Sequence, residues 1–387
     1  MSTTPALSHL PKPVPVRPVA SPTEPIQPRG TFLSPPSFQP FRFFPAGKNS
    51  CRKHRPVVEL TKHLKEIGEK KHGSYSMEPR LCRWLLNSAT LLGQGSHGQV
   101  IDGGDLLDER RGVAIKISFK PREGAYEGEI YRRWQAYRIP HLVRLHASYP
   151  ETIQTVPAWI LVMDKAPLSL AKSLPPGQKL PFPDVLSLFR QLLETHKATS
   201  QHGEVHGDLS ASNIVYMGGK LTVMDLGTAH CPQNGQIPCS FQTIWYRPPE
   251  LLLGRTYDTS IDLWSIGCLI FQAFTGELFT SAGNAKDTLD QIIHRIGFPS
   301  RPYLERCPDT KELCHVYRFM DQPSAAGASL RAKLEEEARL RGLSEQQTSS
   351  LIALLEGIFK YEDRIAPSAA LELCKQIPSE INQNLSA

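Results

Sequence analysis

Polar residues near the middle of the chain have the types and spacing that phosphoryl transfer requires. His206-Gly207-Asp208-Leu209-Ser210-Ala211-Ser212-Asn213 is followed, ten residues later, by Met224-Asp225-Leu226-Gly227. Such transfer needs a carboxylate near the attacking hydroxyl and oxygen ligands for Mg²⁺. Asp208 fits the first need, and Asn213 and Asp225 fit the second. Either segment alone is typical of a polar loop between strands, so the prediction depends on both in this order.

A glycine-rich segment upstream is a candidate phosphate-binding loop. It reads Gly93-Gln94-Gly95-Ser96-His97-Gly98-Gln99-Val100 and lies between two runs typical of strands. Glycine lets the backbone approach a polyphosphate closely and donate its amides. Because a strand rather than a helix follows, the segment is not a dinucleotide-binding fingerprint. Alone, the pattern fits a glycine-rich hairpin equally well.

Lys116 ends the apolar run Val113-Ala114-Ile115-Lys116, sixteen residues after the glycine-rich segment. A lysine there is often an edge residue whose stem covers apolar surface. Beside a phosphate-binding loop it becomes a candidate to hold the α- and β-phosphates. It then needs a carboxylate partner, for which we expect Glu129 in a predicted helix over 126–137. Glu127 is the alternative, because the two side chains point to different faces of that helix.

The elements that position these residues change in type near residue 165. Strand-like runs and one helix come first, at 84–92, 99–102, 112–119, 126–137 (helix), 142–148 and 159–163. Helical patterns follow, at 183–201, 261–276, 285–296, 329–341 and 344–359. This order predicts an α+β fold of two lobes, with an N-lobe over 77–165, a C-lobe over 166–375 and a C-terminal tail over 376–387.

The first part of the chain differs from the rest in composition. Residues 1–46 contain twelve prolines, so we expect a disordered tail there, followed by a basic linker over 47–76 with a short helix at 57–67. Residues 1–75 hold twelve Lys and Arg against four Asp and Glu, and the remainder is nearly neutral. The folded part therefore gives no indication of nucleic-acid binding. The segment CRKHRP (51–56) fits a nuclear-import or phosphate-contacting patch, or simply a solvated charge run.

Composition also bears on location. We expect no secretory signal and no membrane span, because the longest apolar run, 263–274, is too short to cross a bilayer. Eight cysteines are scattered without a CxxC pair, which is typical of free thiols in a reducing compartment. We therefore expect an intracellular protein of the cytoplasm or nucleus, in a host cell if the chain is of viral or pathogen origin.

Together these segments resemble the eukaryotic protein kinase superfamily over residues 88–375. Further elements carry the resemblance: Pro248-Pro249-Glu250 is similar to the APE element, Asp262-Leu263-Trp264-Ser265-Ile266-Gly267 to the DxWSxG helix start, and Arg364 to the arginine that pairs with the APE glutamate. The resemblance implies a bilobal kinase fold, ATP and Mg²⁺ as cofactors, and protein serine or threonine hydroxyls as substrates. It also implies that Ala114 covers the adenine, that Met163 is the gatekeeper, and that Asp164 to Ala166 form the hinge.

The segment Thr243-Ile244-Trp245-Tyr246-Arg247-Pro248-Pro249-Glu250 is similar to the CMGC group, which contains the cyclin-dependent and MAP kinases. Gly207, where most kinases have arginine, resembles the homeodomain-interacting, dual-specificity tyrosine-regulated and pre-mRNA-processing kinase branches. Membership of this group implies a preference for proline after the acceptor hydroxyl.

The catalytic loop departs from the group at two positions. Ser210 stands where these kinases have a lysine that neutralises the γ-phosphate, although HGDLSASN is similar to the loop of the Bud-type kinases, which have a hydroxyl there. Gly207 cannot bind a phosphate on the activation segment, residues 230–241, in which Ser240 occupies the position that resembles the autophosphorylated tyrosine of the homeodomain-interacting kinases. We therefore expect activity that does not depend on loop phosphorylation. The alternative is a nucleotide-binding module without transfer activity, which Ser210 favours.

Overall fold

The computed structural model describes residues 84–95, 98–105, 108–153, 155–232, 242–308, 311–320 and 329–380. The chain divides into residues 1–50 and 51–387, and all described residues belong to the second unit. The expected tail and linker over 1–76 lie outside the described residues, as do Ser96, His97 and Ser240. None of the helices within the described ranges is both long and apolar enough to span a bilayer.

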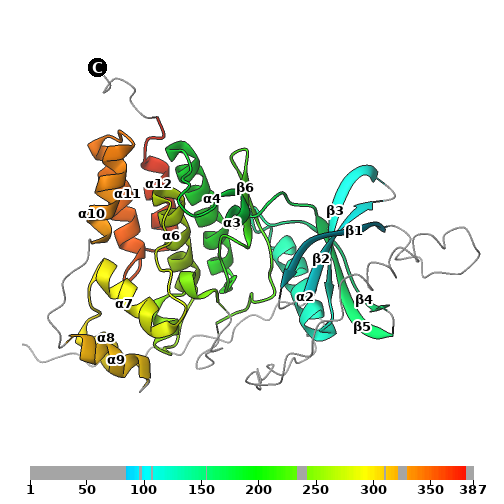
Figure 1. Cartoon of the computed structure of the whole chain (residues 1–387), viewed down its shortest axis with the longest axis horizontal. Coiled ribbons are helices and arrows are strands. Elements are labelled where there is room, and N and C mark those ends of the chain that lie inside the picture. Colours follow the sequence, from blue (N-terminus) through cyan, green and yellow to red (C-terminus); the bar gives the residue numbers. More distant parts are fainter. Residues whose placement is uncertain are drawn as a thin grey trace, which may run out of the picture. The chain divides into compact units, whose positions relative to one another are not determined.

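The first part of the described chain is a five-stranded antiparallel sheet crossed by one helix (Figure 1). The spatial order is β1-β2-β3-β5-β4, with bounds β1 Trp84–Gly95, β2 Gly98–Asp105, β3 Asp108–Ser118, β4 Leu145–Ile153 and β5 Val156–Asp164. Side chains alternate between the two faces of a strand. Val113, Ile115 and Ile117 pack in one buried cluster, so Lys116 is directed to the other face, which helix α2 covers.

Helix α2 (Pro121–Ala136) begins five residues earlier than the sequence predicted. Gly124 lies in the part of the helix that the sequence did not predict and Gly128 in the part that it did, and both allow close packing. A Cβ atom on Gly128 would lie 2.1 Å from Ser148 Oγ, and one on Gly124 would lie 2.6 Å from Trp159 Cβ. The helix can therefore approach the sheet only with glycine at these positions.

Helices predominate after β5, as predicted, and a short hairpin of β6 (Ile214–Met217) and β7 (Lys220–Val223) interrupts them. The remaining elements are α3 Leu170–Ser173, α4 Phe182–Gln201, η3 Ile244–Tyr246, α5 Pro249–Leu252, α6 Ser260–Thr275, α7 Ala285–Ile296, α8 Arg301–Glu305, α9 Lys311–Met320, α10 Leu330–Leu340, α11 Glu345–Ile358 and α12 Pro367–Gln376. The five predicted helices correspond to α4, α6, α7, α10 and α11, each within one residue at either end. The sequence did not predict the remaining elements, which are all short: β6, β7, α3, η3, α5, α8, α9 and α12.

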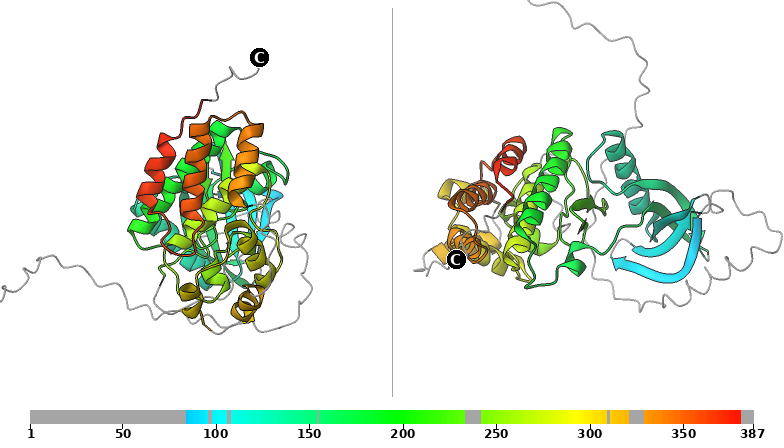
Figure 2. Two further views of the ribbon diagram at one scale, coloured as in Figure 1. Left: turned by 90° about the vertical axis from the view of Figure 1, so that its left-hand side faces the viewer. Right: turned by 90° about the horizontal axis from the view of Figure 1, so that it is seen from above.

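Helix α6 is the centre of the C-lobe (Figure 2). Every residue from Ile261 to Thr275 is buried, which explains an apolar composition on all sides of the helix. It packs against α4, α10 and α11, and α12 packs against α4. The structure is thus the α+β bilobal kinase fold that the sequence predicted.

The expected ion pair between Glu250 and Arg364 is present. Arg364 donates from Nη1 to Glu250 Oε1 at 2.5 Å and from Nη2 to Glu250 Oε2 at 2.7 Å, and both side chains are less than 10% exposed. The guanidinium also lies 5.0 Å from the ring centroid of Trp264. The pair joins the segment before α12 to α5, and so stabilises the C-lobe.

We predict that Arg364→Met lowers the free energy of unfolding by about 3–5 kcal/mol, because the buried Glu250 carboxylate loses its partner. Urea unfolding monitored by circular dichroism measures the change. Arg331→Met is the matched control, since Arg331 pairs with Glu356 at an exposed site, where an ion pair contributes about 0–1 kcal/mol. Equal losses in the two variants would contradict the prediction.

Candidate active site

Lys116 joins three elements at the centre of the candidate site. Its Nζ donates to Glu127 Oε1 of α2 at 2.8 Å and to Asp225 Oδ1, after β7, at 2.9 Å. Burial disfavours the charged amine, but the two carboxylates outweigh burial and hold the pKa of Lys116 above its usual value. A positive charge is therefore kept at the position where a polyphosphate would bind.

Glu127, not Glu129, is the partner of Lys116, which corrects the first expectation. Glu129 lies on the exposed side of α2 and pairs with Arg132. The face that meets the sheet carries Gly124, Glu127, Gly128 and Tyr131, at the i, i+3, i+4 and i+7 spacing of one helical face. Had the two glycines been interpreted as close-packing positions, this spacing would have identified Glu127.

Asp225 is held by its backbone as well as by Lys116. It adopts a left-handed conformation with φ 60°, and its amide donates to Tyr131 Oη of α2 at 2.9 Å. The next residue, Leu226, is fully buried in a cluster with Ile130, Leu145 and other residues of the sheet and α2. The packing of Leu226 fixes the direction of the chain, and thus directs the Asp225 carboxylate toward Lys116.

Asp208 and Asn213 are hydrogen-bonded to each other within one loop. Asn213 Nδ2 donates to the Asp208 carbonyl oxygen at 2.8 Å and to its Oδ2 at 2.9 Å, and the Thr243 amide donates to Asp208 Oδ1 at 2.8 Å. Burial raises the pKa of Asp208, and the Thr243 hydrogen bond opposes that rise. A carboxylate with a raised pKa is a better proton acceptor than an exposed one, as a catalytic base requires.

The backbone of the catalytic loop is fixed by the buried residue Asp262 at the start of α6. Its Oδ2 accepts from the His206 amide at 2.6 Å and its Oδ1 from the Gly207 amide at 3.1 Å. Gly207 has φ 77°, a left-handed conformation that costs glycine little. Asp262 thus acts as the structural residue that the sequence predicted, and it sets the position from which Asp208 extends.

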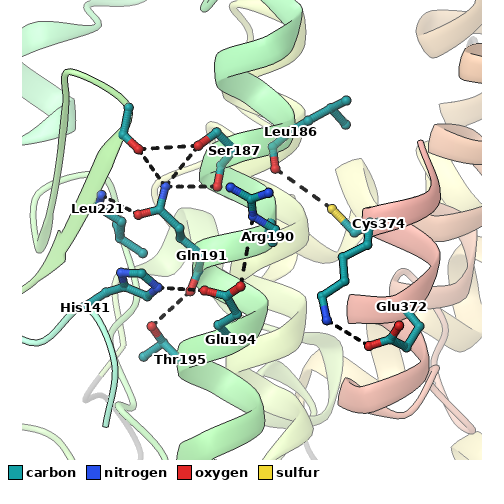
Figure 3. Close-up of polar contacts among 12 residues, drawn as sticks. His141, Leu186, Ser187, Arg190, Gln191, Glu194, Thr195, Leu221, Glu372 and Cys374 are labelled. Carbon is teal, nitrogen blue, oxygen red and sulfur yellow. Dashed lines mark hydrogen bonds and ion pairs between the residues drawn. The ribbon is translucent and has the colours of Figure 1, made fainter. Parts of the chain in front are cut away.

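Helix α4 holds the β6–β7 hairpin, which separates Asn213 from Asp225 (Figure 3). Gln191 Nε2 donates to the Gly219 carbonyl oxygen at 2.9 Å, and its Oε1 accepts from the Leu221 amide at 2.9 Å. Asn213 precedes β6 and Asp225 follows β7, so the buried Gln191 fixes the spacing of the two candidate metal ligands. A single glutamine within an amphipathic helix gave no sequence signal of this function.

Asn213 and Asp225 fit a Mg²⁺ site by the chemistry of their oxygen atoms. Both hydrogen bonds of the Asn213 amide group use Nδ2, which leaves Oδ1 as an acceptor, and the Asp225 side chain is 40% exposed. Amide and carboxylate oxygens suit Mg²⁺, which takes its other ligands from phosphate and water. These two residues would hold the ion, and Lys116 would face the same phosphates.

The nucleotide-binding elements border Lys116 in the sheet. Val100 of β2 pairs with Lys116, and Ala114 of β3 pairs with Met163 of β5. Gly93, Gln94 and Gly95 end β1 opposite Val100, Gln99 and Gly98 of β2. The structure thus places the predicted adenine cover, gatekeeper and glycine-rich loop around one sheet region.

Gly98 and the hinge supply backbone groups to this region. Gly98 has φ 139°, and a Cβ atom there would lie 2.1 Å from the Ile117 carbonyl oxygen, so only glycine fits. In the hinge, the Asp164 amide donates to the Arg144 carbonyl oxygen, whereas the Ala166 amide has no hydrogen-bond partner within the described residues. Ala166 is therefore available to donate to an adenine ring.

Ser210 lies within the catalytic loop, and Thr243, whose amide bonds to Asp208, and Arg247 belong to the segment before α5. Ser210 is 1% exposed and its Oγ has no hydrogen-bond partner among the described residues. Arg247 Nη2 donates to the Gln242 carbonyl oxygen at 2.5 Å, and burial lowers the pKa of Arg247. The buried Ser210 hydroxyl therefore does not supply the charge that a lysine would bring to the γ-phosphate.

Comparison with known proteins agrees with this geometry. The model of the protein kinase domain matches residues 86–375, three quarters of the chain, so the chain belongs to the protein kinase family. It is 36% identical over 147 residues to a probable cell division protein kinase of Encephalitozoon cuniculi, covering 38% of this chain and 45% of that protein. It is 32% identical over 183 residues to a probable cyclin-dependent serine/threonine-protein kinase of Dictyostelium discoideum, covering 46% of this chain and 27% of that protein.

A longer match extends to the human mitogen-activated protein kinase 13, which is 26% identical over 272 residues, covering 66% of this chain and 72% of that protein. The two shorter matches span less than half of the length of the proteins that they match. These relatives are named as cyclin-dependent and mitogen-activated protein kinases, which are members of the CMGC group that the sequence resembles.

Glu127 gives the site a pH dependence. Burial raises its pKa to about 7, although Lys116 opposes the rise. Folding therefore takes up a proton at Glu127 between pH 4.5 and 7, so its contribution to stability is full below pH 4.5 and is lost as the pH rises through 7. The ionised form, which pairs with Lys116, becomes populated over the same range.

We predict that affinity for Mg²⁺ and a non-hydrolysable ATP analogue increases between pH 6 and pH 8, because ionised Glu127 holds Lys116 when Asp225 turns to the metal. Isothermal titration calorimetry at several pH values measures this. In Glu127→Gln the inflection near pH 7 should disappear, whereas Glu129→Gln should keep it. An unchanged inflection in Glu127→Gln would assign the titration to another group.

Proposed function

We propose that this protein transfers the γ-phosphate of ATP to serine or threonine hydroxyls of other proteins in a Mg²⁺-dependent reaction. The observation that carries the proposal is the contact of Lys116 with both Glu127 and Asp225, at 2.8 and 2.9 Å. Lys116 and Asp225 are 109 residues apart in the chain, and a structural lysine has no need of two carboxylates from two lobes. Asp208 and Asn213 are connected to Asp225 through the β6–β7 hairpin.

Each residue then has a role set by its geometry. Lys116 binds the α- and β-phosphates, and Asn213 and Asp225 hold Mg²⁺, which neutralises charge on the phosphates. Asp208 receives the hydrogen bond of the substrate hydroxyl, and accepts its proton as the oxygen attacks phosphorus. Both Asp208 oxygens accept a hydrogen bond from the protein, which orients the carboxylate and leaves a lone pair for the substrate.

The names of the relatives support a serine/threonine kinase of CMGC type. Within that group we assign the chain to the branches with a non-arginine residue before the catalytic aspartate, on the basis of Gly207. A preference for proline after the acceptor is part of the proposal, and a peptide library with and without proline at that position tests it.

Ser210 favours a second candidate function, a nucleotide-binding module without transfer activity. Its buried hydroxyl brings no charge, and loss of one transition-state donor costs about 10²–10³ in rate. We propose that transfer persists at a reduced rate, because the five other polar groups of the site are retained: Lys116 contacts Glu127 and Asp225, and Asn213 contacts Asp208. Nucleotide binding without any transfer would favour the second candidate.

For location, we propose the cytoplasm or nucleus. Within the described ranges, Cys231, Cys268, Cys307 and Cys374 are free thiols, which supports a reducing compartment. Imaging of the tagged protein with and without the basic residues of CRKHRP separates the two compartments.

We predict that Asp208→Asn lowers the rate of transfer by about 10²–10⁴-fold, because it removes the proton acceptor. Incorporation of labelled γ-phosphate into a serine/threonine peptide library with Mg²⁺ measures it, and nucleotide affinity should stay within a few-fold of the wild-type value. Asp287→Asn is a matched control, since the exposed Asp287 bonds to Asn284 at the start of α7, on a different helix of the C-lobe. Equal incorporation by wild-type and Asp208→Asn protein would refute the proposal.

A further inference from the structure

Helix α2 contacts the C-lobe through more than Glu127. Tyr126 Oη donates to the Ala229 carbonyl oxygen at 2.9 Å, near the start of the activation segment. At the other end of the helix, Arg133 Nε lies 2.7 Å from Glu204 Oε1, and Trp134 Nε1 donates to Glu204 Oε2. The two ends of the helix are thus held to the C-lobe on either side of the Lys116 partner.

Glu204 lies two residues before His206, the first residue of the catalytic loop. Its side chain is 4% exposed, and a buried carboxylate is stable only when it is paired. Two of its partners, Arg133 and Trp134, are on α2, and Cys231 also forms a hydrogen bond with it. The next residue, Val205, exchanges backbone hydrogen bonds with His230 at 2.9 and 3.0 Å, so Glu204 is fixed to the base of the activation segment.

The same side chains meet the catalytic loop. The Trp134 ring packs edge-on to the His206 ring, with centroids 6.3 Å apart, and His206 Nε2 lies 2.9 Å from the Met224 carbonyl oxygen, next to Asp225. The Arg133 Nε–H bond is not aligned with the Glu204 oxygen, so the contact is an ion pair and depends on charge rather than on the guanidinium shape. Movement of the end of α2 away from Glu204 would therefore leave the buried Glu204 carboxylate without its cationic partner.

We propose that Glu204 is a positioning residue, which holds α2 where Glu127 reaches Lys116 without a phosphate on the activation segment. This inference rests on the proposed kinase function and explains how the site is maintained. Gly207 offers no guanidinium to bind an activation-segment phosphate. The pair of the buried Glu204 and the partly exposed Arg133 supplies a contact between α2 and the catalytic loop that needs no phosphate.

The test uses the full-length, phosphatase-treated chain and the variant Glu204→Gln. The amide keeps an acceptor for Trp134 and removes only the charge. We expect kcat/KM for ATP to fall by about 10²-fold, since small misplacement of a positioned group has an effect of that size. We also expect faster hydrogen exchange within residues 121–136 and unchanged exchange in α6 and α11.

Matched variants separate positioning from general stability. Glu129→Gln changes the exposed pair of Glu129 with Arg132 on the same helix and should behave as wild type. Arg133→Gln should reproduce Glu204→Gln, whereas Arg133→Lys should restore activity, because the charge is kept.

Three outcomes decide the inference. Wild-type rate and wild-type exchange in Glu204→Gln would overturn it, and so would increased exchange spread equally over all helices. If the wild-type chain shows no transfer, the proposed function is overturned, but exchange within 121–136 still decides whether Glu204 positions α2.

Discussion

The amine of Lys116, held between two carboxylates, is the interaction on which the rest of the site depends. A cation that is 5% exposed is stable only with partners, and its partners come from α2 and from the segment after β7. The strand, the helix and the C-lobe loop must therefore be assembled before the charge can be buried. The energetic requirement for pairing thus couples folding of the two lobes to formation of the site.

The helical core, rather than the loops, determines the geometry on the C-lobe side. Asp262 of the fully buried α6 accepts two amides of the catalytic loop, and Gln191 of α4 binds the hairpin between Asn213 and Asp225. Loops carry the chemistry, but each is hydrogen-bonded to a helix whose own position is fixed by apolar packing. A change in the packing of this helical core would therefore displace the residues of the site.

Features that depend on residues close together in the sequence could be predicted, whereas features that depend on contacts between distant elements could not. Asp208 and Asn213 were identified because they lie five positions apart within one loop of recognisable sequence. The long helices were identified because their apolar residues recur with a clear helical period. The partner of Lys116 required knowledge of which face of α2 meets the sheet, and two glycines obscured it. The role of Glu204 could not be predicted from the sequence. Its partners on α2 are about 70 residues away in the chain, and the contact is recognised only in the folded structure.

The most direct measurement is calorimetric titration of the purified protein with a non-hydrolysable ATP analogue, with and without Mg²⁺. The arrangement of Lys116, Asn213 and Asp225 predicts affinity that depends on Mg²⁺ and that Asp225→Asn abolishes. Absence of Mg²⁺-dependent binding in the wild-type protein would show that these side chains do not form a nucleotide site.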